Sequence, residues 1–238
     1  MRSPNNGSGA NNILRFAADG TATVFSSDAL LRAPNGMVFD ANGNMVVSNG
    51  NNNVLKITPS GSASVFASGP LFNSNQSIAI DTIGNVFVAT SFQNPETIAK
   101  ITPDGTVSLF ASGGSLNVPN GLAFDASGNL FAANSRPSTI SKITSSGSMS
   151  VFSSDPLLQG PSNLAFDASG DLFVANYNTN SILRITPSGV VSTFASSGLL
   201  NGPSGLVIQP VPEPSTYAMA LAGLACGGFS MWRRRKPA

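Results

Sequence analysis

Apolar and polar positions recur along this chain in a fixed order. A short apolar run is followed by a polar turn that contains Asp and Gly, and then by a second apolar run, as in residues 121–133. Asp accepts hydrogen bonds from the amides of such a turn, and Gly adopts positive φ without steric cost. Two apolar runs joined in this way predict a β-hairpin. Neither run alternates cleanly, so both strands should be buried on both faces.

The hairpin pattern occurs four times, at spacings of 41, 44 and 42 residues, with its turn aspartates at Asp40, Asp81, Asp125 and Asp167. A second pattern consists of a Lys or Arg, apolar residues around a turn that ends in Gly, and a run that ends in Phe. It occurs five times, with its turn glycines at Gly20, Gly61, Gly105, Gly147 and Gly189. Each full unit therefore holds four short strands. A four-stranded repeat of about 40–50 residues is typical of a β-propeller blade.

The side chains that repeat with each blade have structural interpretations. The aspartates should form turns, because the remainder of a calcium-binding loop is absent. The terminal phenylalanines should pack between blades; they are Phe25, Phe66, Phe110, Phe152 and Phe194. The cations should reach solvent with their stems over apolar surface; they are Arg15, Lys56, Lys100, Lys142 and Arg184.

We therefore predict an all-β propeller of about five blade positions over residues 13–208. Residues 13–25 match only the second half of a blade, and residues 202–208 begin a further unit. Joining these two ends in one blade would close a five-blade ring and remove a free sheet edge. That blade would lack its second strand, so an N-terminally truncated, larger propeller is the alternative.

The flanking segments differ in composition from the repeats. Residues 1–12 are polar and lack the apolar region of a secretory signal peptide. Residues 209–216 form a proline-rich, extended linker. Residues 217–238 hold an apolar run followed by four cations, Arg233, Arg234, Arg235 and Lys236. We predict one transmembrane helix here, with the cations as a cytoplasmic stop and the repeats on the other side of the membrane.

Composition excludes several kinds of function. The chain has 12 basic and 11 acidic residues, without the basic face of a nucleic-acid-binding protein. It contains no histidine, which removes the commonest general base and a common metal ligand. Its single cysteine, Cys226, has no partner for a disulfide within the chain. We expect no cofactor and no catalytic residue.

The C-terminal segment resembles the PEP-CTERM sorting signal of bacterial proteins. The resemblance rests on Pro212, Glu213 and Pro214, then an apolar helix, then the basic stop. It implies recognition by an exosortase-type processing enzyme, removal of the helix, and transfer from the inner membrane to the cell surface or extracellular matrix. Such proteins also carry an N-terminal signal peptide. We therefore expect that the start site of this sequence is assigned too far downstream.

The repeats resemble NHL-type propellers and the gluconolactonase/regucalcin-like family. In the latter, a divalent metal at the channel mouth is bound by acidic residues and by the Asn of a Pro-Asn-Gly phrase. The equivalent positions here include no carboxylate; they are Asn35, Gln76, Asn120, Ser162 and Ser204. Hard cations need charged oxygen ligands, so we predict no metal here and treat these residues as possible ligand contacts. Alternatively, Asn35 and Asn120 only form turns by bonding their own backbone.

These observations favour a non-enzymatic, surface-directed propeller that binds a glycan or protein, or that forms part of an extracellular matrix. The alternative is a metal-dependent, lactonase-like hydrolase, and a third possibility is a structural spacer. A streptogramin-lyase type of activity is disfavoured because it needs histidine. An aromatic sugar-binding platform is not evident, since the chain has one Trp and two Tyr residues.

Overall fold

A computed structural model describes residues 11–91 and 95–208. The chain divides into two compact units, residues 1–207 and residues 208–238. The predicted sorting motif, apolar helix and basic stop lie outside the described residues, as does most of the polar N-terminal segment. No helix within the described residues is long and apolar enough to span a membrane.

The first unit contains four antiparallel sheets of four strands each, in sequential order. One sheet holds β3 (Met37–Phe39), β4 (Met45–Asn49), β5 (Asn53–Ile57) and β6 (Ala63–Ser68). The next holds β7 (Asn75–Ile80), β8 (Val86–Thr90), β9 (Thr97–Ile101) and β10 (Val107–Ser112). The third holds β11 (Pro119–Phe124), β12 (Leu130–Ser135), β13 (Ser138–Ile143) and β14 (Met149–Ser153). The fourth holds β15 (Pro161–Phe166), β16 (Leu172–Asn176), β17 (Ser181–Ile185) and β18 (Val191–Ser196).

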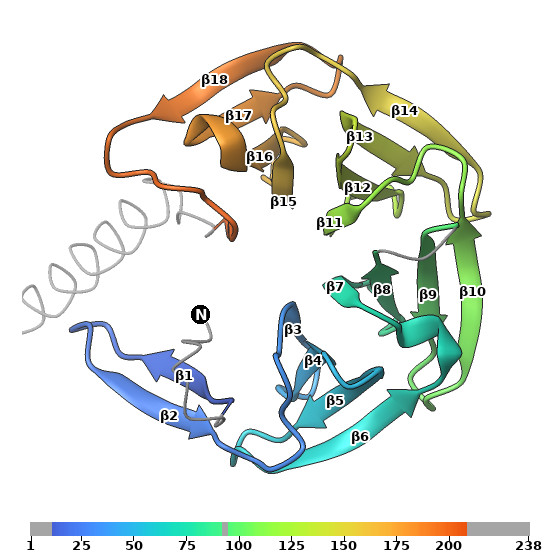
Figure 1. Cartoon of the computed structure of the whole chain (residues 1–238), viewed down its shortest axis with the longest axis vertical. Coiled ribbons are helices and arrows are strands. Elements are labelled where there is room, and N and C mark those ends of the chain that lie inside the picture. Colours follow the sequence, from blue (N-terminus) through green and yellow to red (C-terminus); the bar gives the residue numbers. More distant parts are fainter. Residues whose placement is uncertain (1–10, 92–94, 209–238) are drawn as a thin grey trace, which may run out of the picture. The chain divides into compact units, whose positions relative to one another are not determined.

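The sheets follow one another around an arc, with the first strand of each nearest the middle and the last strand outermost (Figure 1). Two short 3-10 helices, η1 (Pro70–Phe72) and η2 (Tyr177–Thr179), interrupt the connections. This arrangement confirms the predicted propeller with about five blade positions.

The fifth sheet has two strands, β1 (Ile13–Phe16) and β2 (Ala22–Ser26), which pair only with each other among the described residues. Residues 203–208 form no strand. They are bound to the preceding blade instead: Ser162 Oγ donates to the Pro203 carbonyl at 2.7 Å, and the Leu206 amide donates to Asn163 Oδ1 at 3.2 Å. The predicted composite blade of β1, β2 and residues 202–208 is therefore absent.

The hairpin turns use the predicted chemistry. In the turn between β11 and β12, Asp125 Oδ1 accepts the amides of Ser127 and Asn129 at 2.9 and 2.8 Å. Asn129 Nδ2 donates to the other carboxylate oxygen at 2.8 Å, and Gly128 has a φ of 79°. The three other turn aspartates accept amide hydrogen bonds in the same way. All four aspartates are turn formers.

The core lies between neighbouring blades. The second strands β4, β8 and β16 are buried at every residue, and β12 is buried at every residue except Ser135. The first strands are only partly buried, contrary to the prediction, because their inner side faces the middle of the arc. Aromatic contacts join the strands: the Phe87 ring lies 4.8 Å from Phe110 and 5.1 Å from Phe124, edge to face.

The inner strands of adjacent blades touch in two alternating ways. A Cβ atom at Gly121 would lie 2.7 Å from Asn163 Cα, so glycine allows close backbone contact there. At the equivalent position of the preceding blade, Ser77 Oγ accepts the Leu122 amide at 3.0 Å. Both contacts hold neighbouring inner strands side by side. The residues at the beginnings of these strands therefore gather at one end of the blades.

Candidate functional site

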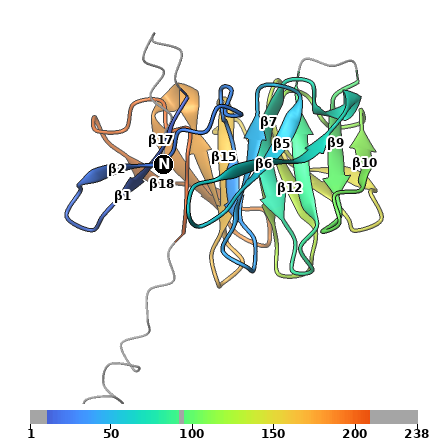
Figure 2. The same ribbon diagram turned by 90° about the horizontal axis from the view of Figure 1, so that it is seen from below.

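The five channel-mouth residues predicted from the sequence line one pocket of about 410 Å³. The remaining lining residues are Gly160 and four residues at the connections between second and third strands: Ser135 at the end of β12, then Arg136, Tyr177 and Asn178. Figure 2 shows the blades from the side, with the short orange helix η2 at their upper end. The pocket is thus built from two kinds of loop on the same end of the propeller.

The predicted residues play different parts within the pocket. Asn35 Nδ2 donates to Gln76 Oε1 at 3.0 Å, which links two adjacent blades. Ser162 Oγ donates to the Ala175 and Pro203 carbonyls, at 3.0 and 2.7 Å, so this hydroxyl is used in hydrogen bonds within the fold. The half-buried Asn120 makes no side-chain hydrogen bond with any other described residue. Neither Asn35 nor Asn120 bonds its own backbone through its side chain, and the Asn120 amide is free for a ligand.

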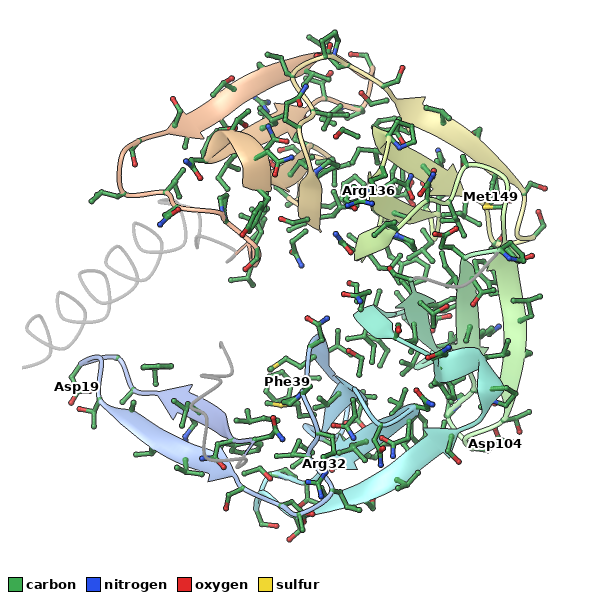
Figure 3. The ribbon with its side chains drawn as sticks, in the orientation of Figure 1. Asp19, Arg32, Phe39, Asp104, Arg136 and Met149 are labelled. Atoms are coloured by element: carbon green, nitrogen blue, oxygen red, sulfur yellow. The ribbon has the colours of Figure 1, made fainter. Side chains whose placement is uncertain are left out.

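Arg136 is the one charged side chain among the described residues that line the pocket. It lies in the turn between β12 and β13, and Figure 3 draws its side chain over the inner part of the fold, near β11 and β15. Its guanidinium is exposed and has no hydrogen bond or ion pair with any residue of the described ranges. Arg184, by contrast, donates from Nε to Asp171 Oδ2 at 2.8 Å. Arg136 is therefore an uncompensated cation in a neutral, polar surround.

Two glycines make room for the side chains of η2. A Cβ atom at Gly160 would lie 2.7 Å from Asn178 Nδ2, and one at Gly202 would lie 2.8 Å from the Tyr177 ring. The Tyr177 amide donates to the Gly160 carbonyl at 3.1 Å. Tyr177 remains 52% exposed, so its ring presents a face to the solvent while its backbone is held in place.

The Arg136 turn and the η2 turn are joined through the same glycine. The Gly160 amide donates to Ser138 Oγ at 2.9 Å, at the start of β13, while the Gly160 carbonyl accepts the Tyr177 amide. The side chain of Asn176 fixes the loop before Gly160, because its Oδ1 accepts the Gln159 amide at 2.7 Å. A rigid connection thus positions the cation and the aromatic ring on neighbouring blades.

Ser135, Arg136, Tyr177 and Asn178 were not predicted as site residues. They lie at or next to the connections between second and third strands, where the sequence does not follow the repeat. Residues 135–137 read Ser-Arg-Pro, whereas the corresponding residues 177–179 read Tyr-Asn-Thr. This departure from the repeat is the sequence signal that marks them.

The pocket does not suit a divalent metal. Its lining offers amide and hydroxyl oxygens without a carboxylate, and it includes the cationic Arg136. Hard cations prefer charged oxygen ligands. Within the described residues, no three His, Cys, Asp or Glu side chains lie close enough together to hold a metal ion. The metal site of the gluconolactonase-like family has no counterpart in this donor set.

Comparison with protein families gives two matches. Residues 6–217 match the virginiamycin B lyase family, and residues 210–236 match the PEP-CTERM protein-sorting motif. No curated protein is similar enough to the chain to count as a match.

Several solved structures resemble the fold at low sequence identity. A catalytically inactive virginiamycin B lyase from Staphylococcus aureus with quinupristin has a TM-score of 0.63 and 19% identity, over 73% of this chain and 59% of that one. A gluconolactonase from Xanthomonas campestris has a TM-score of 0.67 and 17% identity, over 79% and 69% of the chains. A chain of a nidogen/laminin complex has a TM-score of 0.65 and 21% identity, over 75% and 68%. The chain spans between 58% and 62% of the length of the lyases that it matches.

Proposed function

Because the chain belongs to the virginiamycin B lyase family and carries a PEP-CTERM sorting motif, we propose that it is an exported β-propeller that binds a glycan without converting it chemically. The lining of the central pocket carries this proposal. Its residues offer amides, hydroxyls, one aromatic ring and one cation. These groups bind polar ligands well, and apart from Tyr177 the described lining includes none of the side chains that usually act as a general acid or base.

The absence of histidine supports a binding role over a lyase activity. In the solved Staphylococcus aureus structure, the enzyme is described as catalytically inactive after one histidine was replaced by alanine. The present chain contains no histidine at all. Among the described residues that line its pocket, no side chain is a carboxylate, a lysine or a cysteine.

The lactonase alternative gains no support from the pocket. A metal-dependent hydrolase needs a metal to polarise the carbonyl or activate water. The neutral donors around Asn120 and the nearby cation Arg136 are a poor match for such an ion. Neither residue supplies the missing base.

A glycan fits the pocket better than an apolar ligand or a nucleic acid. Amide side chains both donate and accept hydrogen bonds, and so do sugar hydroxyls. Asn120 has its full hydrogen-bonding capacity free, and the Tyr177 ring offers a half-exposed face on which a sugar ring can stack. One cation is too few for phosphate-backbone binding.

The sorting motif supports a role for this binding outside the cell. A PEP-CTERM motif implies processing by an exosortase-type enzyme and a membrane-associated precursor. We infer that residues 217–238 are removed and that the propeller then joins the cell surface or extracellular matrix. A glycan of that matrix is the ligand available in this location.

The test is retention of the full-length chain, purified in mild detergent, on immobilised extracellular polysaccharide of the source cells. The chain should be retained, and Asn120→Ala together with Tyr177→Ala should abolish retention. Asn42→Ala serves as a matched control, because Asn42 is exposed in a hairpin turn and does not line the pocket. Failure to bind any polysaccharide, or turnover of a lactone or a streptogramin, would contradict the proposal.

A further inference from the structure

The unpaired cation in the pocket identifies a more specific ligand. We propose, resting on the glycan-binding function above, that the ligand is an acidic saccharide whose carboxylate is bound by Arg136. Within residues 11–91 and 95–208, the guanidinium has no partner, and no carboxylate lines the pocket with it. This part of the chain thus provides a positive charge without a group that neutralises it.

The side-chain type fits a carboxylate. Arg presents a planar fork of donors that matches a carboxylate through two parallel hydrogen bonds. Two cations on the third strands of the blades have partners within the fold. Lys56 Nζ lies 3.4 Å from Asp40 Oδ2 and 4.4 Å from the centre of the Phe66 ring, and Arg184 is held by Asp171. Arg136 is the pocket-lining cation, and its donors are not committed.

The neighbouring groups fit the remainder of a sugar acid. Asn120 and Asn178 line the same pocket and bring amides that pair with ring hydroxyls. The Tyr177 ring, packed beside Gly202, provides a stacking surface. A hexuronic acid unit combines the three matching features: a carboxylate, several hydroxyls and a ring with one apolar face.

The fold holds these groups in place before a ligand arrives. Gly160 bonds to Ser138 on one side and to Tyr177 on the other, so the Arg136 turn and the η2 turn share one anchor. Binding then requires little ordering of the backbone, which reduces the entropic cost of association. The exposed Arg136 side chain must still become ordered when it binds the carboxylate.

Calorimetric titration of the full-length chain in detergent tests the inference, with three probes of equal length. These are an oligogalacturonate, its methyl ester, which lacks the charge, and a sulfated neutral oligosaccharide. The oligogalacturonate should bind at least about 10-fold more tightly than the ester, which is a modest value for a charge-assisted hydrogen bond. Tighter binding of the sulfated probe would overturn the carboxylate assignment.

Variants of matched charge complete the test. Arg136→Gln should abolish the preference for the acid over the ester, while the affinity for the ester stays unchanged. Arg15→Gln removes the same charge from exposed Arg15 on β1, outside the pocket lining, and should change nothing. Unchanged thermal midpoints would show that both variants fold, as expected for exposed side chains.

The outcomes separate this inference from the function on which it rests. Equal binding of acid and ester by the parent chain would overturn the role of Arg136 while leaving a glycan-binding propeller. The same conclusion follows if the source polysaccharide is retained equally by the parent and by Arg136→Gln. If no polysaccharide is bound by any form of the chain, the proposed function itself fails.

Discussion

At the scale of single residues, the hairpin turns depend on both a side chain and a backbone angle. Asp125 accepts two turn amides, and Gly128 adopts a φ of 79°. A Cβ atom at Gly128 would meet no atom within 4 Å, so any cost of a larger residue comes from the backbone alone. This separates conformational strain from steric clash.

Gly128→Val should therefore lower the free energy of unfolding by about 1–3 kcal/mol, since a β-branched residue is strained at positive φ. Gly198→Val is the matched control, because Gly198 is equally open but does not have positive φ. Chemical denaturation of the full-length chain measures both. Equal losses in the two variants would show that the turn geometry is not the cause.

The sequence located those lining residues of the candidate pocket that belong to the repeat. Asn35, Gln76 and Asn120 are found by aligning one phrase across blades, and the structure places them around one pocket. Arg136 and Tyr177 were not predicted because the connections between second and third strands differ in sequence from one unit to the next. Their positions depend on contacts through Gly160, and periodicity does not reveal such contacts.

At the scale of elements, equivalent positions in different blades have different surroundings. Phe152 packs edge to face on Phe131 at 5.0 Å and contacts the core cluster between two blades. Phe194 makes the same kind of contact with Phe173 at 4.9 Å, but it is 62% exposed. Each blade thus carries a phenylalanine near the end of its last strand, but the exposure of that side chain differs between blades.

Phe152→Ala should cost about 3 kcal/mol of stability, the lower end of the range for removing a packed aromatic side chain, because Phe152 is only partly buried. Phe194→Ala should cost less than about 1 kcal/mol, because most of that ring already faces water. Denaturant titration compares the two variants directly. A larger loss for Phe194→Ala would mean that another surface covers this ring in solution.

The same comparison shows why the strands were predictable and the closure was not. Four short strands per unit follow from the turn residues and from apolar runs such as those around Asp125. The fate of residues 203–208 follows instead from the contacts of Ser162 and Asn163 with Pro203 and Leu206. These two side chains of β15 hold residues 203–208 against the fourth blade. No local sequence pattern shows whether the segment also pairs with β1.

At the scale of the whole molecule, the charges determine how stability changes with pH. Hydrogen bonds from Thr102 and Thr106 lower the pKa of Asp104, and the amides of Leu30 and Ala63 lower the pKa of Asp28. A carboxyl group with a lowered pKa stabilises the fold above its unfolded pKa of about 3.9, and that stability is lost as pH falls through the folded value. The chain has no histidine to add a transition near neutrality.

The thermal midpoint should thus be nearly constant between about pH 6 and 8 and should fall below about pH 4. Asp104→Asn should weaken the acid dependence, because the side chain at this position no longer titrates. Scanning calorimetry across this range measures both effects. A pronounced change near pH 6 or 7 would contradict the expectation.

The sorting motif concerns the location of the whole protein. Glu213 lies between Pro212 and Pro214, and prolines on both sides favour an extended backbone that remains outside regular secondary structure. The sequence predicts that this segment adjoins a membrane span and is accessible to a processing enzyme. It also predicts that the apolar run holds the precursor until cleavage and that the four cations orient it.

Behind a working signal peptide, in a host with an exosortase, the protein should be released without residues 217–238. In a host without that enzyme, it should remain full-length in the membrane fraction. Glu213→Ala with Pro214→Ala should block release, whereas Gln209→Ala with Thr216→Ala, which flank the motif, should leave release intact. Mass spectrometry of the secreted and membrane fractions distinguishes these outcomes. If the motif variant is processed as well as the parent, Pro-Glu-Pro is not the recognised element and the tail acts only as an anchor.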